Sequence, residues 1–81
     1  MKSIHSDDYR HVVEILAATR TARGIQQTAV AAALGKPQSY VSKVEGRERR
    51  LDVIEFIAFC RVLDVSPIAI LREAKLLRDT D

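Results

Sequence analysis

The sequence has 81 residues, 47% of them hydrophobic, which is enough for one small folded domain but too short for an additional catalytic or ligand-binding domain. The net charge is only +2, yet the stretch from Arg20 to Arg50 contains seven Lys and Arg residues and two acidic ones, so it carries +5 and the remainder −3. This distribution is typical of a polyanion-binding face, although charge alone fits chance clustering on a solvated surface equally well.

Cys60 is the single cysteine, which excludes an intramolecular disulfide and favours a reducing, cytoplasmic setting over a secreted one. Because Cys60 lies in an apolar helical run, we expect it to be a small core residue and not a catalytic thiol. The first ten residues contain no apolar segment, and the longest strongly apolar run, 53–60, is interrupted by Glu55. Neither a signal peptide nor a membrane span is therefore expected.

The first part of the chain shows two helical patterns. Apolar residues recur at helical spacing from 7 to 23, where Ser6 can cap the start of the helix and Gly24 can end it. A second, short helix is predicted for 27–34. The apolar positions behind these two predictions are Tyr9, Val12, Val13, Leu16, Ala17, the connector Ile25, Val30, Ala31 and Leu34.

Gly35 and Pro37 separate the second predicted helix from a third. Gly35 permits a sharp reversal, and Pro37 lacks an amide hydrogen and has a φ that suits the first position of a helix. A helix is therefore predicted from about 37 to 45, with Val41 and Val44 facing inward.

The C-terminal third contains two more cap signals. Asp52 is a good N-cap for a helix at 53–63, and Ser66 followed by Pro67 is a cap and first residue for a helix at 67–78. With no strand candidate, the sequence predicts an all-α, five-helix fold. We expect a single domain over 1–81 with its core at about 7–78.

The region at about 27–46 has the pattern of a helix-turn-helix motif. Ala31 is the small residue at the point where two short helices must approach closely, and Gly35 supplies the turn four residues later. Val41 and Val44 form the inward side of the second helix. The spacing by itself is moderately specific.

The longer string RTARGIQQTAVAAALGKPQSYVSKVEGRERRLDVIEFIAFCRVLDVSP resembles the phage-repressor and Cro type of helix-turn-helix protein, often called XRE-like or lambda-repressor-like. The resemblance extends over roughly residues 10–71. It implies a compact five-helix domain that binds double-stranded DNA and regulates transcription. The expected function is that of a repressor that acts as a homodimer on an inverted-repeat operator.

The resemblance also assigns roles to individual residues. The base-contacting positions of the family fall on Gln38, Ser39 and Lys43, whose side chains offer the donors and acceptors that base edges need. The alternative is that these three residues are only exposed polar side chains on a surface helix and do not contact DNA. The positions that contact phosphates fall on Gln27, Lys36, Arg47, Arg49 and Arg50, and Gln27 in such proteins often braces the first base-contacting side chain.

Arg20 and Glu45 match positions that form a structural ion pair in several of these repressors, between the first helix and the end of the third. The sequence departs from the family at three nearby places. Glycine usually stands at the position of Arg47 and not at Gly46, Lys36 replaces a commonly apolar turn residue, and Pro37 replaces a Ser or Thr cap. The first departure bears on the contacts of the loop after the third helix.

The helix predicted at 53–63 has more apolar residues than one core-facing stripe requires. Val53, Phe56, Cys60 and Leu63 suffice for the core. The surplus predicts a homodimer contact, for which the candidates are Ile54, Ile57, Ala58, Val62, Ile68 and Leu71. Leu76 and Leu77 are further apolar residues of the last predicted helix. Burial of this helix on nearly all sides within one chain is the alternative.

Two other functions compete with DNA binding as interpretations of the sequence. An enzyme is not expected, because His5 and His11 have no ligand or triad spacing and Asp7 and Asp8 fit the first turn of a helix. No cofactor or metal is expected either. A protein-interaction module, such as an antitoxin-like partner on the same scaffold, remains the competing hypothesis, since a fold alone does not fix function.

Overall fold

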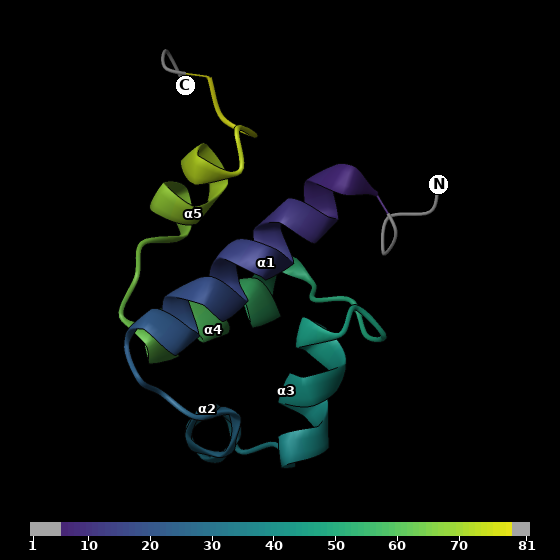
Figure 1. Cartoon of the computed structure of the whole chain (residues 1–81), viewed down its shortest axis with the longest axis vertical. Coiled ribbons are helices and arrows are strands. Elements are labelled where there is room, and N and C mark those ends of the chain that lie inside the picture. Colours follow the sequence, from purple (N-terminus) through teal and green to yellow (C-terminus); the bar gives the residue numbers. More distant parts are fainter. Residues whose placement is uncertain (1–5, 79–81) are drawn as a thin grey trace.

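The computed structural model describes residues 6–78, and within this range the secondary structure consists of five helices and no strand, as predicted. They are α1 (Asp7–Ala22), α2 (Gln27–Leu34), α3 (Gln38–Glu45), α4 (Val53–Leu63) and α5 (Pro67–Glu73). Figure 1 shows α2 and α3 at one end of the long axis and α5 at the other, with α1 and α4 between them. The short helix α2 packs against both α3 and α4.

The predicted caps lie where the helices begin. The Ser6 hydroxyl accepts a hydrogen bond from the amide of Tyr9 at 3.1 Å and so caps α1. Asp52 caps α4 and forms a reciprocal capping box with Glu55, in which each side chain accepts from the other residue's amide. Ser66 caps α5.

The turn between α2 and α3 depends on Gly35. Its φ is +67°, in the left-handed region that glycine adopts without steric cost, and the amides of Gly35 and Lys36 bond back to carbonyls in the last turn of α2. The chain reverses within three residues. As a result, α2 and α3 form the predicted helix-turn-helix pair.

One predicted boundary is shifted by one residue and another is wrong. Pro37 has an extended ψ of 155° and stands at the N-cap position, so α3 begins at Gln38. The last helix ends at Glu73 and not near residue 78: Lys75 has a φ of +62°, which turns the chain away from the helical path. This turn leaves Ala74 buried at the end of α5.

The core lies between all five helices and includes Cys60, which is fully buried as predicted; burial raises the pKa of its thiol. Val53, expected in the core, is instead 70% exposed. Phe59 is buried in its place and packs against the ring of Tyr40 at 6.1 Å between ring centroids. Val53 stands in the first turn of α4, beside an apolar groove that the chain leaves open.

Arg47 follows α3 with a φ of +60°, a left-handed conformation in a residue that has a Cβ atom. The chain therefore needs left-handed geometry at the position where the family usually has glycine, whereas Gly46 has an ordinary φ of −80°. For a residue with a Cβ atom this conformation costs about 1–2 kcal/mol.

We expect Arg47→Gly to raise the free energy of unfolding by about 0.5–1 kcal/mol, because the relieved strain exceeds the extra entropy of glycine in the unfolded chain. Urea denaturation measures the change. Arg47→Ala is the matched control, since it removes the same charge but keeps the Cβ atom, and it should bring no gain. Equal stabilities for the two variants would contradict this account.

Candidate nucleic-acid interface

The helix α3 has one buried face and one exposed face. Tyr40, Val41 and Val44 are buried against the core, as their spacing of three and four residues dictates for a helix. Gln38, Ser39, Ser42 and Lys43 are exposed. The three side chains predicted to contact bases therefore lie on the outward side of one short helix.

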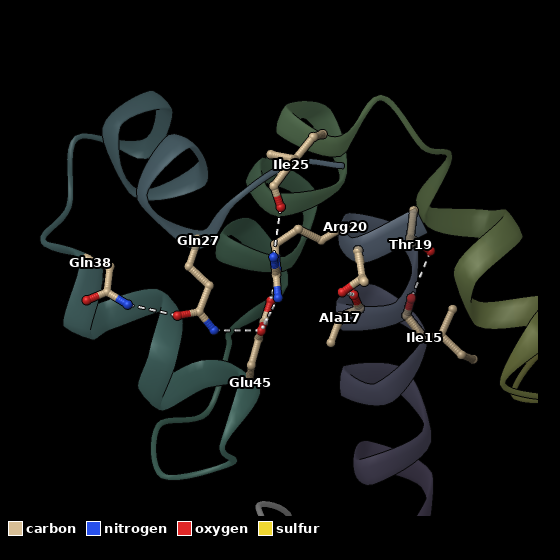
Figure 2. A network of polar contacts seen from close by, with 9 residues as sticks. Ile15, Ala17, Thr19, Arg20, Ile25, Gln27, Gln38 and Glu45 are labelled. Carbon is tan, nitrogen blue, oxygen red and sulfur yellow. Dashed lines mark hydrogen bonds and ion pairs between the residues drawn. The ribbon is translucent and has the colours of Figure 1, made fainter. Parts of the chain in front are cut away.

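A chain of hydrogen bonds runs from Gln38 into the interior of the domain (Figure 2). The Nε2 of Gln38 donates to Oε1 of Gln27 at 2.8 Å, and the Nε2 of Gln27 donates to Oε1 of Glu45 at 2.8 Å. Gln27 stands at the start of α2, and Glu45 at the end of α3. Gln27 thus holds the side chain of Gln38 in position, the bracing role that the family resemblance implied for it.

Arg20 and Glu45 form an ion pair at the inner end of this series of hydrogen bonds. The Nε of Arg20 is 2.6 Å from Oε2 of Glu45, its Nη2 is 3.0 Å from Oε1, and its Nη1 donates to the carbonyl of Ile25 at 2.7 Å. The two side chains are only 16% and 13% exposed. The hydrogen bonds that Arg20 donates to Glu45 raise the pKa of Arg20, and the pair joins α1 to the end of α3.

Two further arginines of the cationic stretch also bind within the domain. Arg23 donates to the carbonyls of Leu63 and Asp64 and so joins the end of α1 to the end of α4. Arg49 forms a two-point ion pair with Glu55, with Nη2 at 2.8 Å from Oε2 and Nη1 at 3.1 Å from Oε1. Its guanidinium also lies 4.6 Å from the ring centre of Tyr40.

Fewer positive charges are therefore available to a partner than the seven Lys and Arg residues between Arg20 and Arg50 suggest. Within residues 6–78, Lys43 and Arg47 form no hydrogen bond or ion pair through their side chains, and Lys36 only lies over the ring of Tyr40 at 5.4 Å. Arg50 is exposed in the loop before α4. Lys43 lies on α3 itself, Lys36 precedes that helix and Arg47 follows it, so these three charges belong to α3 and the chain next to it.

Sequence reasoning missed three residues that hold this loop. The Tyr9 hydroxyl donates to the carbonyl of Arg49 at 3.5 Å and accepts from the amide of Leu51 at 3.0 Å. Glu55 and Tyr40 hold the guanidinium of Arg49. The spacing Asp52-x-x-Glu55 is a capping-box signal that could have identified Glu55, whereas no local pattern identifies Tyr9 as the partner of a loop 40 residues away.

Glu55 also makes the stability of the domain depend on pH. The hydrogen bonds from Arg49 and from the amide of Asp52 lower its pKa from 4.5 to about 2. Because the folded-state pKa lies below the unfolded value, the contribution of Glu55 is complete above about pH 5 and disappears as the pH falls to about 2.

We therefore expect the free energy of unfolding of the wild type to fall more steeply between pH 5 and pH 2 than that of Glu55→Gln. Chemical denaturation followed by circular dichroism at several pH values provides the comparison. Glu48→Gln, which alters an exposed carboxylate in the same loop, is the matched control. Parallel pH curves for the wild type and Glu55→Gln would exclude this role.

The described part of the chain, 6–78, contains no group of three or more His, Cys, Asp or Glu side chains placed to hold a metal ion. His11 is exposed on α1, Asp7 and Asp8 lie in the first turn of that helix, and His5 lies outside the described residues. No helix within the described range is long and apolar enough to cross a membrane.

Comparisons with known proteins agree with this geometry. A family model described as helix-turn-helix matches residues 16–70. An XRE-family like protein from Pseudomonas syringae pv. tomato is 49% identical and has a TM-score of 0.83, with 91% of this chain and 90% of that chain covered. No functionally curated protein matches the chain.

Two other solved structures have the same fold. The restriction-modification controller protein C.AhdI from Aeromonas hydrophila is 29% identical, with a TM-score of 0.70 over 85% of this chain and 98% of that one. The clp gene regulator ClgR from C. glutamicum is 22% identical, with a TM-score of 0.74 over 83% and 88%, and it shows the likeness of fold alone. From the matched motif and the 49% identity, the chain belongs to the XRE family of helix-turn-helix DNA-binding proteins.

Proposed function

We propose that this protein is a sequence-specific regulator of transcription, a repressor, that binds double-stranded DNA through α3 and acts as a homodimer on an inverted-repeat operator. The observation that carries the proposal is the outward face of α3, where Gln38, Ser39 and Lys43 are exposed and Gln38 is held by Gln27. A regulator of this kind would act in the cytoplasm, where its DNA is.

The chemistry of this face suits the major groove. Lys43 can donate to guanine O6 or N7, Ser39 can donate or accept at several base edges, and Gln38 combines a donor with an acceptor. An α-helix fits into the major groove, and in helix-turn-helix proteins the N-terminal residues of the second helix contact the bases. Gln38 and Ser39 are the first two residues of α3.

Contacts with phosphates are proposed for Gln27, Lys36, Arg47, Arg49 and Arg50. Lys43, Lys36 and Arg47 have the fewest partners within the domain, so their charges are the most available. Arg49 would contact a phosphate while still bound to Glu55, or would act mainly by holding the loop in shape. Such contacts set the position of the protein on DNA without specifying a sequence.

Selection of bound duplexes from a random pool at physiological salt tests DNA binding, site sequence and half-site symmetry together. Gln38→Ala or Lys43→Ala should then relax the base preference at one position per half-site and cost about 1–3 kcal/mol of binding free energy. Arg47→Ala should weaken binding to all sequences alike. It should also make the slope of log binding constant against log salt concentration shallower by about one unit.

Arg72→Ala is the control for these variants, because it removes one exposed positive charge from α5, at the far end of the molecule. It should change neither the affinity nor the selected sequence by much. Absence of any salt-sensitive, sequence-dependent binding by the wild type would refute the proposed function.

The homodimer is proposed from the apolar side chains that the monomer leaves exposed. Ile54 is 74% exposed, Val53 70% and Ile68 53%. Of the candidates from the sequence, Ile57 and Ala58 are half-buried, while Val62 and Leu71 pack against the core of their own chain. We therefore centre the proposed contact on Val53, Ile54 and Ile68. A two-fold dimer would place two recognition helices about 34 Å apart.

The same apolar surface is what an antitoxin-like protein-interaction module would use to bind a different protein. The exposed charges around α3 favour DNA as one partner, whereas the surface on α4 fits either a second copy or another protein. Both functions predict a partner on α4. Only the DNA-binding hypothesis predicts loss of base preference when α3 is altered.

A further inference from the structure

The loop between α3 and α4 has its backbone fixed on both sides of Arg50. The amide of Leu51 donates to the hydroxyl of Tyr9 at 3.0 Å, and the same hydroxyl donates to the carbonyl of Arg49 at 3.5 Å, a longer and weaker hydrogen bond. The carbonyl of Arg50 accepts from Nη1 of Arg49 at 2.9 Å. The peptide groups before and after Arg50 are therefore both held by side chains.

The two side chains that hold this backbone are themselves fixed by the helices. Arg49 binds Glu55 of α4 through both Nη atoms, and its guanidinium lies 4.6 Å from the ring centre of Tyr40 on α3. Tyr9 stands in the capped first turn of α1 and lines the same apolar groove as Leu51. The loop is thus anchored to α1, α3 and α4 at once.

Arg49 and Arg50 differ in where their charges are directed. Nη1 of Arg49 donates to Glu55 and to the carbonyl of Arg50, and Nη2 donates to Glu55, so three of its five N–H donors are used within the domain. Arg49 is also partly buried, whereas Arg50 is exposed in the same loop. The arrangement uses Arg49 to hold the backbone that carries Arg50.

We propose that Tyr9 is a positioning residue of the DNA interface: its hydroxyl, together with Arg49, fixes the loop backbone so that the side chain of Arg50 meets a DNA phosphate. A loop that already has its bound shape loses less conformational entropy on binding, so the phosphate contact is stronger. This inference rests on the proposed function, and it assigns Arg49 to the structure of the loop and not to a phosphate.

The test is a double-mutant cycle of Tyr9→Phe and Arg50→Ala, with binding to the selected operator measured at several salt concentrations. Arg50→Ala removes one charge and should make the slope of log binding constant against log salt concentration shallower by about one unit. Tyr9→Phe removes no charge and keeps the ring, so a hydroxyl without a role in phosphate binding would leave this slope unchanged.

We expect Tyr9→Phe to make the slope shallower by at least about half a unit and to weaken binding about three- to tenfold, the worth of one hydrogen bond. In the Arg50→Ala background, Tyr9→Phe should change neither the slope nor the affinity further. Thr21→Val is the matched control, because it removes a hydroxyl of α1 that donates to the carbonyl of Ala17 in the same helix. It should keep the wild-type slope.

Arg49→Lys supplies a second measurement, in case Tyr9→Phe does not fold. Lysine keeps the positive charge but lacks the planar fork that binds Glu55 and the carbonyl of Arg50 together. If Arg49 acts by holding the loop, this variant should also have a slope shallower by at least about half a unit. If Arg49 itself contacts a phosphate, the retained charge should preserve the wild-type slope, which would overturn the role assigned to Arg49.

Three results would overturn the inference while leaving α3 as the DNA-binding helix. They are a wild-type slope in folded Tyr9→Phe, an unchanged slope in Arg50→Ala, and equal effects of Tyr9→Phe in the presence and absence of the Arg50 side chain. Absence of salt-sensitive, sequence-specific binding by the wild type would instead refute the proposed function.

Discussion

Arg20→Met is expected to lower the free energy of unfolding by about 3 kcal/mol, measured by urea denaturation at pH 7. The loss arises because Glu45 would keep its charge while only 13% exposed, with Gln27 as its remaining partner. Removal of one partner from a buried ion pair typically costs about 3–5 kcal/mol, and partial exposure of this pair sets the expectation at the lower end.

The double variant Arg20→Met with Glu45→Leu is the control for this prediction. Replacement of both charges by apolar groups leaves no buried charge unpaired, so most of the lost stability should return. If the double variant is no more stable than Arg20→Met, the loss is due to packing of the Arg20 stem and not to the unpaired carboxylate. A single variant as stable as the wild type would show that the pair contributes little to folding.

Ile54→Asp is expected to raise the dissociation constant of the proposed homodimer at least 100-fold. The change places a carboxylate at the most exposed large apolar side chain of α4, where a dimer would bury it without a partner, and about 2.7 kcal/mol of lost association energy is enough for a 100-fold effect. Sedimentation equilibrium at micromolar concentration compares the variant with the wild type.

Ala18→Asp is the matched control, because it introduces the same charge at an exposed position of α1, on a different helix from Val53, Ile54 and Ile68. It should leave association unchanged. A wild-type mass that stays at 9.1 kDa at all concentrations, with a DNA footprint over a single half-site, would refute the homodimer. In that case the exposed face of α4 would remain as a site for a different protein.

The prediction of α4 shows where periodicity is a weak guide. The helix and its cap at Asp52 were predicted correctly, because both depend on neighbouring residues. Its inward face was predicted with Val53 and without Phe59. Nearly every side chain of this helix is apolar, so the sequence pattern contains little information on which of them other helices cover.

The amino-acid sequence by itself determined the number and order of the helices and most of their starts, together with the turn at Gly35 and the outward face of α3. These features are local: a cap, a proline, a left-handed glycine or a helical repeat acts on residues within one or two turns. The family resemblance rested on the same local strings.

Only the tertiary structure decided which charges are available to a partner. In the sequence, Arg23 and Arg49 each contribute one positive charge, as Lys43 does. In the structure, Arg23 donates to carbonyls about 40 residues away, and Arg49 binds Glu55 and lies over the ring of Tyr40. The direction of the Gln38 amide likewise depends on a carboxylate that folding brings next to Gln27. Such contacts arise from the packing of α1, α2, α3 and α4 against one another, and no local pattern encodes them.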